Sequence, residues 1–373
     1  MNTLASVAVA FGGPSPEHDV SILTGLLAAG ELARTPRARS LRALYWAKSG
    51  AWYEVPVDAE PVAFLEGPPK AARPVELRLG PDGGFVESGR LGRRERPLDI
   101  DAVLVCCHGG PGEDGSLQGA LDLAGLAYSG PDAAGAALGM DKLASGAVVR
   151  AAGLPVLPRL LLSASTEPHF AGPYIVKPRY GGSSIGIEVV ADAASARARL
   201  GSNHHLRRGA VLEPYRPDLF DLQVAVRTWP ALELSAIERP IRRQADAEIL
   251  NYADKYVGAE GMHAAPRELP AVIPSTLEKR LRDMALAASV ELGCRGINRI
   301  DFLSNGEELY LNELNTVPGS LSRHLFVDPP LRFGELLEDL LVEAVERPGA
   351  QFSSAGSDGA ILRGVGSIEG KLG

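Results

Sequence analysis

The sequence predicts an α/β protein built from two or three packed subdomains, and two observations support this prediction. The chain has 373 residues, which is more than one simple hydrophobic core usually holds. In its first third, apolar runs of strand length alternate with amphipathic stretches of helix length. That alternation is typical of a parallel sheet connected by crossover helices. The composition, with 45% hydrophobic and 23% charged residues, is that of an ordinary globular protein.

The first third begins with the apolar run "SVAVAF", which predicts a buried strand, followed by an amphipathic helix over residues 17–34. Two further strands are predicted at "LRALYWAK" and "DAVLVCC". The Gly/Pro-rich residues 49–96 separate these two strands and contain a hairpin-like turn at "LGPDGGFVE". A second helix, "LQGALDLAGL", is expected to end at Gly125 or at the turn of Ser129 and Gly130.

The rest of the chain continues with one Ala-rich helix over residues 132–152, which Gly153 is expected to end. After the linker "LPVLPRL", residues 155–215 follow the pattern strand, Gly/Ser loop, strand, helix, strand. A polar loop is expected at 240–268, and residues 351–373 are Gly/Ser-rich and expected to form a flexible tail. The last third has predicted strands "LFDLQVAV", "ALELSAIE", "INRIDFL" and "ELYLNEL", a helix at about 275–293 and a terminal helix.

The net charge, the apolar runs and the cysteine content argue against several classes of protein. A net charge of −8 argues against nucleic acid as the main partner, because phosphate binding needs a basic face. We find no apolar stretch long enough to span a bilayer, so no membrane partner is expected. The N-terminal "LASVAVAF" lacks a basic region and a cleavage site, and is interpreted as a strand of a cytoplasmic protein. Three cysteines fit neither a disulfide framework nor a zinc site.

The segment "KPRYGGSSIG", residues 177–186, is the first candidate for a binding loop, because it directly follows a predicted strand. Its glycines would let the backbone approach an anion, its serines add hydroxyl donors, and Lys177 supplies a charge at the strand end. The alternative is an ordinary Gly/Ser turn between two strands. The sequence contains no GxxxxGK[ST] phosphate loop, and no G-x-G-x-x-G follows the first strand.

Acidic and amide side chains form the second candidate. Asp301 lies in "NRIDFL", while Glu313 and Asn315 end "LYLNELN". If these strands pair through the short turn "SNGEE", the three side chains converge at one rim. Oxygen ligands of this kind suit Mg²⁺, which prefers a few carboxylates together with phosphate oxygens and water. The alternative is an exposed hairpin with ordinary polar residues, but carboxylates among apolar neighbours need a partner.

Together these motifs resemble the D-alanine–D-alanine ligase family of the ATP-grasp superfamily over roughly residues 5–345. The matching motifs, in order, are "FGGPSPEHDVS", "HGGPGEDGSLQG", "MDK" at 140–142, "IVKPRYGGSSIGI", "YADKY" at 252–256, "NRIDF" and "LNELNTVPG". The resemblance implies an ATP-grasp fold of three α/β subdomains. These would be a Rossmann-like N-terminal domain (1–131) that binds the first amino acid, a central subdomain (132–215), and a C-terminal subdomain (216–350) with the metal and substrate site.

The resemblance also implies a nucleotide site. Glu213 would meet the adenine amino group, and Asp221 would accept hydrogen bonds from the ribose hydroxyls. At Asp221 the spacing is one residue longer than is usual in the family, which commonly has Glu there. Asp301, Glu313 and Asn315 would hold two Mg²⁺ ions, for which Mn²⁺ could substitute. The residues implied to contact ATP are Lys142, Lys177, Ser183, Ser184, Glu213, Asp221 and Lys255.

For the amino acids, the resemblance implies that Glu17 binds the ammonium group of the first substrate. His108 would lie near its carboxylate, although a merely structural histidine is the alternative. Arg299 and the backbone N–H of Gly319 would form the oxyanion hole. Tyr256, Ser183 and Glu17 would be linked by hydrogen bonds and close the 240–268 loop over the site. Lys255, His324 and Leu325 would contact the substrates.

The sequence departs from the family pattern at His324, where a serine that binds the second substrate's carboxylate is usual. The alternative is that the loop has shifted and that Ser320 or Ser322 takes over. Tyr256 favours a peptide-forming acceptor, because D-lactate-forming relatives typically lack that tyrosine.

We therefore expect an ATP-dependent ligase that joins two D-amino acids, most simply two D-alanines, through an acyl phosphate for peptidoglycan synthesis. The family suggests a homodimer. One alternative is a diverged ligase of a specialised pathway with a different second substrate. A non-catalytic nucleotide-binding protein is a further alternative, but the intact charged residues argue against it.

Overall fold

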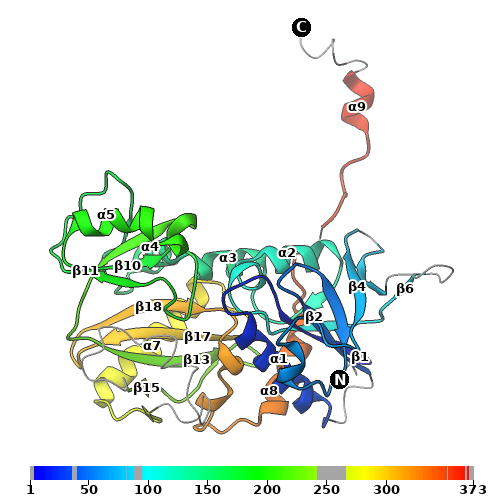
Figure 1. Cartoon of the computed structure of the whole chain (residues 1–373), viewed down its shortest axis with the longest axis horizontal. Helices are drawn as coiled ribbons and strands as arrows, with labels where there is room; N and C mark the ends of the chain where they lie inside the picture. The colour runs from blue at the N-terminus through cyan, green and yellow to red at the C-terminus, as the bar shows by residue number, and fades with distance from the viewer. Residues whose placement is uncertain are drawn as a thin grey trace.

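The structure of the chain is a computed structural model that describes residues 4–35, 40–80, 82–87, 95–241, 266–350, 352–365 and 368. Three main sheets form the body of the protein (Figure 1). The N-terminal sheet lies at one end, and two four-stranded sheets, formed by the middle and the last third of the chain, lie at the other. The α/β fold class predicted from the sequence is confirmed.

The N-terminal sheet is mixed, whereas the sequence predicted a parallel one. Its centre is parallel, because β1 pairs with β2 on one side and β7 on the other, and β7 pairs with β8. From β2 outward the strands are antiparallel. The reason is the Gly/Pro-rich excursion at 49–96, whose short connections form hairpins, whereas a parallel pair needs a long crossover. The strand order is β6 (Arg96–Pro97), β5 (Gly84–Glu87), β4 (Arg73–Arg78), β3 (Trp52–Val55), β2 (Ser40–Trp46), β1 (Ser6–Gly12), β7 (Ala102–Val105) and β8 (Ala127–Tyr128).

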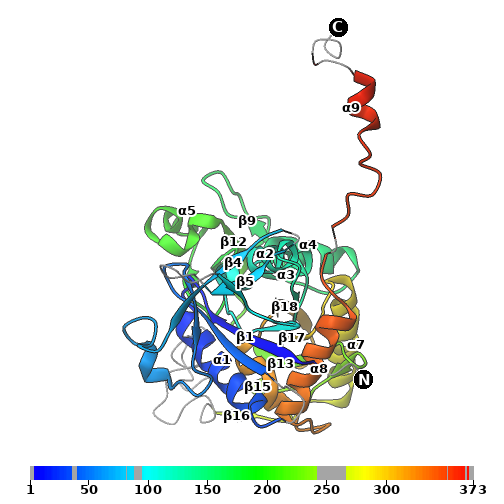
Figure 2. The same cartoon turned by 90° about the vertical axis from the view of Figure 1, so that its right-hand side faces the viewer.

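Helices cover both faces of this sheet. On one face, α1 (His18–Leu32) packs together with α8 (Phe333–Glu346), which returns from the far end of the chain to contact β7 (Figure 2). Their apolar side chains share one core with the inward residues of β1, including Val9 and Phe11. On the other face, α2 (Ser116–Leu123) places Leu117 and Leu121 against the sheet.

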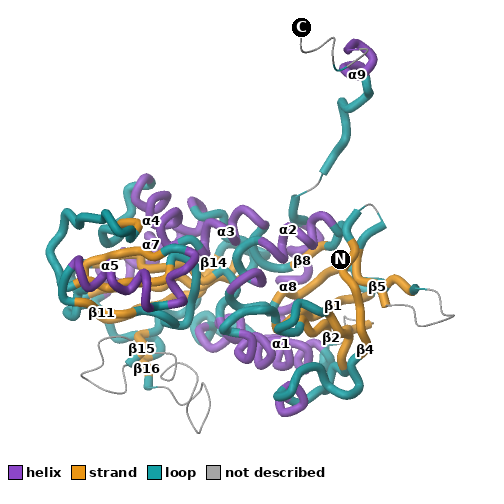
Figure 3. The backbone as a smooth tube through the Cα atoms, turned by 45° about the horizontal axis from the view of Figure 1, so that its top comes forward, coloured by secondary structure: helices purple, strands orange, loops and turns teal. Residues whose placement is uncertain are grey.

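The central sheet is antiparallel, with α5 (Ala193–Ser202) packed against it (Figure 3). The single helix predicted at 132–152 is two helices, α3 (Ala133–Met140) and α4 (Lys142–Ala151). Asp141 between them is extended, and its carboxylate accepts from the N–H groups of Leu143 and Ala144. A helix break with a new N-cap therefore interrupts the Ala-rich run. The strands are β11 (Glu188–Val190), β10 (Tyr174–Pro178), β12 (Ala210–Pro214) and β9 (Leu160–Leu161).

The C-terminal sheet contains the hairpin predicted through the turn "SNGEE", with α7 (Ser275–Glu291) packed on it. Of the strand predicted at 231–238, only two residues are regular, because Ser235 Oγ accepts from the Ala225 N–H and so replaces a ladder carbonyl. The strands are β14 (Glu233–Leu234), β13 (Phe220–Arg227), β17 (Ile297–Ser304) and β18 (Leu309–Asn315), with β15 (Arg239–Pro240) and β16 (Arg267–Glu268) paired separately.

The chain beyond residue 350 leaves the body and carries a short helix, α9 (Ala360–Val365), well away from the sheets (Figure 1). Among the described residues, no helix is both long enough and apolar enough to cross a membrane. Short 3₁₀ helices lie at Pro61–Phe64, Gly110–Gly112 and His204–Arg208, and Gly319–Leu325 is a kinked helical segment interrupted by non-helical residues.

Candidate active site

A cavity of about 270 Å³ is lined by residues from the N-terminal, central and C-terminal sheets and their loops. Leu325, predicted to contact substrate, does not line it, and its side chain is fully buried in the core shared by α1 and α8. Lys255 and Tyr256, with most of the predicted 240–268 loop, lie outside the described residues. The predicted residues that line the cavity are Glu17, His108, Lys142, Lys177, Ser183, Ser184, Glu213, Asp221, Arg299, Asp301, Glu313, Asn315, Gly319 and His324.

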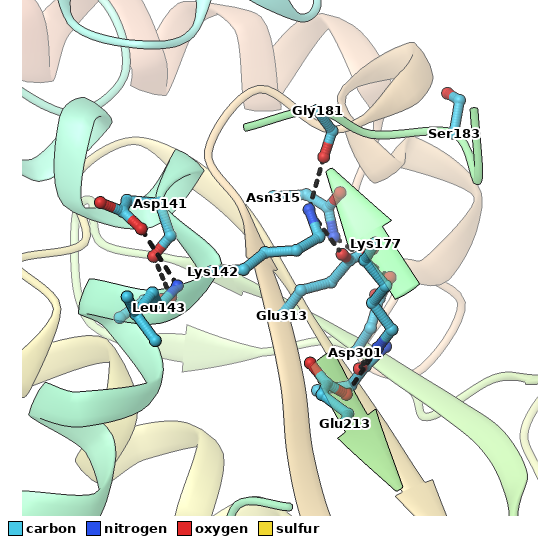
Figure 4. A network of polar contacts seen from close by, with 12 residues as sticks. Asp141, Lys142, Leu143, Lys177, Gly181, Ser183, Glu213, Asp301, Glu313 and Asn315 are labelled. Atoms are coloured by element: carbon cyan, nitrogen blue, oxygen red, sulfur yellow. Dashed lines mark hydrogen bonds and ion pairs between the residues drawn. The ribbon is translucent and has the colours of Figure 1, made fainter. Parts of the chain in front are cut away.

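Two lysines reach the same part of the cavity from different elements (Figure 4). Lys142 starts α4, and its Nζ donates to the Gly181 carbonyl and lies 3.3 Å from Glu313 Oε2. Lys177 is the next-to-last residue of β10, and its Nζ lies 2.8 Å from Glu213 Oε2 and 3.1 Å from Asn312 Oδ1. Both side chains are buried. Two buried ammonium groups therefore face one cavity, and each is paired there with a carboxylate.

Glu213 holds this cationic region together from β12. Its side chain is 1% exposed, and its carboxylate lies 2.8 Å from both Lys177 Nζ and Arg159 Nε. Burial alone would raise the pKa of Glu213, but the adjacent Arg159 and Lys177 charges outweigh burial and keep that pKa below its ordinary value. Glu213 is therefore ionised at neutral pH. In this arrangement the Glu213 carboxylate already pairs with two cations. The predicted hydrogen bond from an adenine amino group would have to form in addition to these two ion pairs.

The Gly/Ser loop after β10 carries the next group of predicted residues. Ser183 and Ser184 both have left-handed backbone conformations, with φ of 54° and 58°. Such conformations are costly for residues other than glycine and are typical of functional loops. Ser183 Oγ donates to Glu17 Oε1, which links the central sheet to the N-terminal sheet across the cavity. The predicted hydrogen bond between Ser183 and Glu17 is present.

The ends of β17 and β18 bring the predicted metal ligands together. Asp301 and Glu313 are register partners, next to a bulge at residues 301 and 302. Asn315 Nδ2 donates to Asp301 Oδ2 at 3.1 Å. Arg299 holds Asp301 through two hydrogen bonds, of 2.6 and 2.8 Å. The predicted convergence of these side chains at one rim is therefore found in the structure.

These donors fit a hard divalent cation. Two carboxylates and an amide supply the oxygen ligands that Mg²⁺ prefers, with room in the cavity for further oxygens. Within the described ranges, no group of three or more His, Cys, Asp and Glu side chains is arranged to hold a metal ion. The predicted set has only two carboxylates, so it would need oxygens of the substrate or water to complete a coordination shell.

Glu17 and His108 lie on the N-terminal side of the cavity. Gly109 has a φ of 63°, and a Cβ added there would lie 2.3 Å from Glu17 Oε2, so only glycine lets the backbone pass this carboxylate. His108 Nδ1 lies 2.7 Å from the Val317 carbonyl, and Nε2 lies 2.8 Å from Thr24 Oγ1. Burial lowers the pKa of His108 to about 4, so the ring is neutral at pH 7. Contact with a substrate carboxylate would require one of these bonds to be given up.

Glu113 is a functional candidate that the sequence reasoning missed. Its Oε2 accepts from the Gly109 N–H at 2.9 Å, and its Oε1 accepts from the N–H groups of Thr316 and Val317 at 3.1 and 3.0 Å. Burial, and then the charge of Glu17, raise the pKa of Glu113 to about 7. The available signal was the acid inside the glycine-rich "GGPGEDG", where a carboxylate beside closely packed backbone needs several donors.

His324 lines the cavity and pairs there with an acid that lines the same cavity. Its Nε2 lies 3.2 Å from Glu238 Oε2, and Glu238 also accepts from Gln223 and pairs with Arg267 at 3.1 Å. Burial alone would raise the pKa of Glu238, but His324, Arg267 and Gln223 together keep that pKa below its ordinary value. Of the two alternative serines, Ser320 lines the cavity, whereas Ser322 is fully buried and does not.

The cavity has cationic groups and oxygen ligands on one side and a carboxylate on the other. Lys142 and Lys177 supply cations, the β17–β18 hairpin supplies oxygen ligands, and Glu17 supplies a carboxylate near the opposite wall. Asp221, the predicted ribose ligand, lines the cavity from β13. The site has charges and hydrogen-bond donors for holding reactants in place, as phosphoryl transfer requires.

Two family models and several known proteins are similar to this chain. The family model described as D-ala D-ala ligase N-terminus matches residues 6–131, and that described as D-ala D-ala ligase C-terminus matches residues 157–346. A D-alanine--D-alanine ligase of Bradyrhizobium sp. strain BTAi1 is 32% identical over 84% of this chain and 86% of its own length. That of Mycobacterium tuberculosis strain H37Rv is 31% identical over 91% of this chain and 96% of its own. The structure of VanG D-Ala:D-Ser ligase from Enterococcus faecalis, at 26% identity, covers 92% of this chain and 100% of its own with a TM-score of 0.74.

Proposed function

This chain belongs to the D-alanine–D-alanine ligase family, and from that premise we propose that it uses ATP to join two D-alanine molecules into a dipeptide. The product would serve the synthesis of peptidoglycan precursors in the cytoplasm. The observation that carries the proposal is the meeting of Lys142, Lys177 and the acidic β17–β18 hairpin in one cavity. A nucleoside triphosphate carries several negative charges and is bound together with a metal ion. A cavity with cations on one wall and metal ligands on another would fit such a ligand, whereas a single charge pair would not be enough.

In the first step, the carboxylate of one D-alanine attacks the γ-phosphate of ATP; the bond from that phosphate to the β-phosphate oxygen breaks, ADP leaves, and an acyl phosphate forms. Lys142 and Lys177 would neutralise phosphate oxygens, and Asp221 would accept from the ribose. Glu17 would hold the ammonium group of the first D-alanine, oriented by its bond from Ser183. These residues act by positioning and charge neutralisation, which is what phosphoryl transfer needs.

In the second step, the amino group of the other D-alanine attacks the acyl phosphate, and phosphate leaves from a tetrahedral intermediate. Arg299 and the Gly319 N–H would stabilise the oxyanion of that intermediate. His324, held by Glu238, would stand near the carboxylate of the second amino acid. The lid expected at 240–268, with Lys255 and Tyr256, lies outside the described residues.

Asp301, Glu313 and Asn315 would hold two Mg²⁺ ions, which supply positive charge beside the β- and γ-phosphates when bound. The fit rests on the donor set, because the three side chains are hard oxygen ligands on one hairpin. Arg299 and Lys142 would give up part of their pairing with Asp301 and Glu313 to accommodate this charge.

The subdomain limits of 1–131, 132–215 and 216–350, and a homodimeric state, are parts of the same proposal. It is tested by phosphate release from ATP with D-alanine, with L-alanine and without an amino acid, together with mass-spectrometric detection of the dipeptide. We expect release and dipeptide with D-alanine only. Lys48→Met, at an exposed lysine paired with Asp19, should behave as wild type, whereas Lys177→Met should lose activity. Absence of D-alanine-dependent phosphate release would refute the proposal.

A further inference from the structure

We propose that Thr24, His108 and Glu113, all from the N-terminal part of the chain, are positioning residues that hold the turn at residues 316–320 in its working conformation. The inference rests on the proposed function, because this turn contains Gly319, the expected oxyanion donor, and directly follows Asn315. It assigns His108 to the turn of the protein itself instead of to the substrate's carboxylate.

The hydrogen bonds of His108 define a directed chain. The Val317 oxygen is a carbonyl and can only accept, so His108 Nδ1 carries the proton and donates to it at 2.7 Å. In the neutral ring, Nε2 is then an acceptor, and Thr24 Oγ1 donates to it at 2.8 Å. Thr24 Oγ1 in turn accepts from the Ser320 N–H at 3.1 Å. The Thr24 hydroxyl and the His108 ring therefore bind the backbone on both sides of Gly319, at Ser320 and at Val317.

Glu113 holds the start of the same turn. Its Oε1 accepts from the backbone N–H groups of Thr316 and Val317, and the Thr316 hydroxyl lies 3.2 Å from the same oxygen. Its Oε2 accepts from the Gly109 N–H, next to His108. Glu113 and His108 therefore bind adjacent residues of the turn from one glycine-rich loop. Both side chains are buried, as is Thr24, so water competes little for these bonds.

The turn needs such support because the backbone conformation directly after Gly319 is unfavourable. Ser320, Leu321 and Ser322 have φ of 48°, 50° and 51°, three consecutive left-handed residues without a glycine among them. Left-handed residues of this kind persist only where the surrounding structure enforces them. The bond from Ser320 N–H to Thr24 acts on the first of the three. The position of the Gly319 N–H is thus set by contacts from the opposite subdomain.

The proposal is tested with Thr24→Val, which keeps the shape of the side chain and removes both hydrogen bonds. Thr24→Ser keeps the hydroxyl and serves as the rescue variant. Ser289→Ala is the matched control, because Ser289 is also a buried helix hydroxyl but donates to Leu286 within its own helix, at 2.7 Å. Two quantities are measured: steady-state kcat and KM for D-alanine and ATP, and amide hydrogen exchange in the peptide covering residues 316–322.

We expect Thr24→Val to lower kcat about tenfold with an unchanged KM for ATP, as expected for a misplaced oxyanion donor. Hydrogen exchange in 316–322 should accelerate. Thr24→Ser should restore both, and Ser289→Ala should change neither, even if its melting temperature falls equally. If Thr24→Val does not fold, His108→Asn replaces it, since its amide retains a donor toward Val317 and loses the link to Thr24.

An unchanged kcat in a folded Thr24→Val enzyme, or a Thr24→Ser enzyme as impaired as Thr24→Val, would overturn the proposal. If the wild type releases no phosphate with D-alanine, the proposed function fails, but the exchange comparison still decides this inference. In that case faster exchange of 316–322 in Thr24→Val supports the hold on the turn, and unchanged exchange overturns it.

Discussion

Replacing Glu213 by glutamine isolates the energetic role of the buried charge cluster. The substitution retains the size of the side chain and removes the negative charge that faces Lys177 Nζ and Arg159 Nε, both at 2.8 Å. The two cations have side chains only 7% and 3% exposed, so water cannot replace the lost carboxylate. Arg159 would retain its bonds to the carbonyls of Lys142 and Asn312, which lessens the effect.

The expected loss of folding free energy in Glu213→Gln follows from the burial of the charges. Removing one partner of a buried ion pair typically costs about 3–5 kcal/mol, because a charge is left buried without compensation. The carbonyls that Arg159 retains place Glu213→Gln near the lower end, at about 3 kcal/mol. Glu167→Gln is the control: Glu167 pairs with Arg197 at a similar 3.0 Å, but its side chain is 80% exposed. For such a surface pair the expected cost is below about 1 kcal/mol.

The assay is equilibrium unfolding in urea of both variants and the wild type. Because the pKa of Glu213 is lowered in the folded protein, its stabilisation is present at neutral pH and is lost as the pH falls through that folded-state value. The difference between wild type and Glu213→Gln should therefore shrink in acid, while that of Glu167→Gln stays small. If Glu213→Gln costs no more than Glu167→Gln at pH 7, the buried cluster of Glu213, Lys177 and Arg159 does not stabilise the site.

Three further perturbations test other parts of the site. Glu313→Gln removes a charge from the expected metal ligands 3.3 Å from Lys142, and turnover should fall on the order of 10²-fold; near-normal turnover at saturating Mg²⁺ would remove Glu313 from the metal site. His324→Ser should raise kcat/KM for D-alanine as the second substrate about tenfold, measured from pH 6 to 9, and identical pH profiles of both forms would place the serine's role elsewhere. Because the pKa of Glu113 is raised to about 7, ionising it costs folding free energy, so the contribution of Glu113 to wild-type stability should decline by up to about 3 kcal/mol between pH 4.5 and 7. Glu113→Gln should lack that decline in urea unfolding, and an equal decline in both proteins would contradict this assignment.

The periodicity of the sequence predicted most elements, because their burial patterns are strong. The fully buried β1 is an example, as is the hairpin of β17 and β18. Periodicity does not reveal the direction of a strand, so the antiparallel edge of the N-terminal sheet was missed. Nor does it reveal a local competitor for hydrogen bonds, which is why Asp141 splits one predicted helix and Ser235 ends a predicted strand.

The residues of the site were also predicted only in part. Residues in recognisable motifs, such as Lys142 and Asp301, were predicted and line one cavity, although their individual roles remain predictions. Two residues whose partners lie far away in the chain were missed, because nothing in the sequence around them indicates those partners. Glu113 accepts from Thr316, 203 residues further on, and Arg159 reaches Glu213 and Asn312 from a segment that looked like a linker.

The packing of α8 on the N-terminal sheet has a consequence for synthesis of the chain on the ribosome. The face of β1 and β7 that α1 only partly covers is completed by Leu336, Leu337 and Leu340, which are synthesised long after both strands. Until residues 333–346 emerge, this apolar face stays exposed to water and to other chains. The first 131 residues therefore cannot reach their final stability as an isolated nascent domain. Their folding is completed only when α8 docks on the sheet. Truncation before Phe333 should yield chains that aggregate or bind chaperones even though every predicted active-site residue is present.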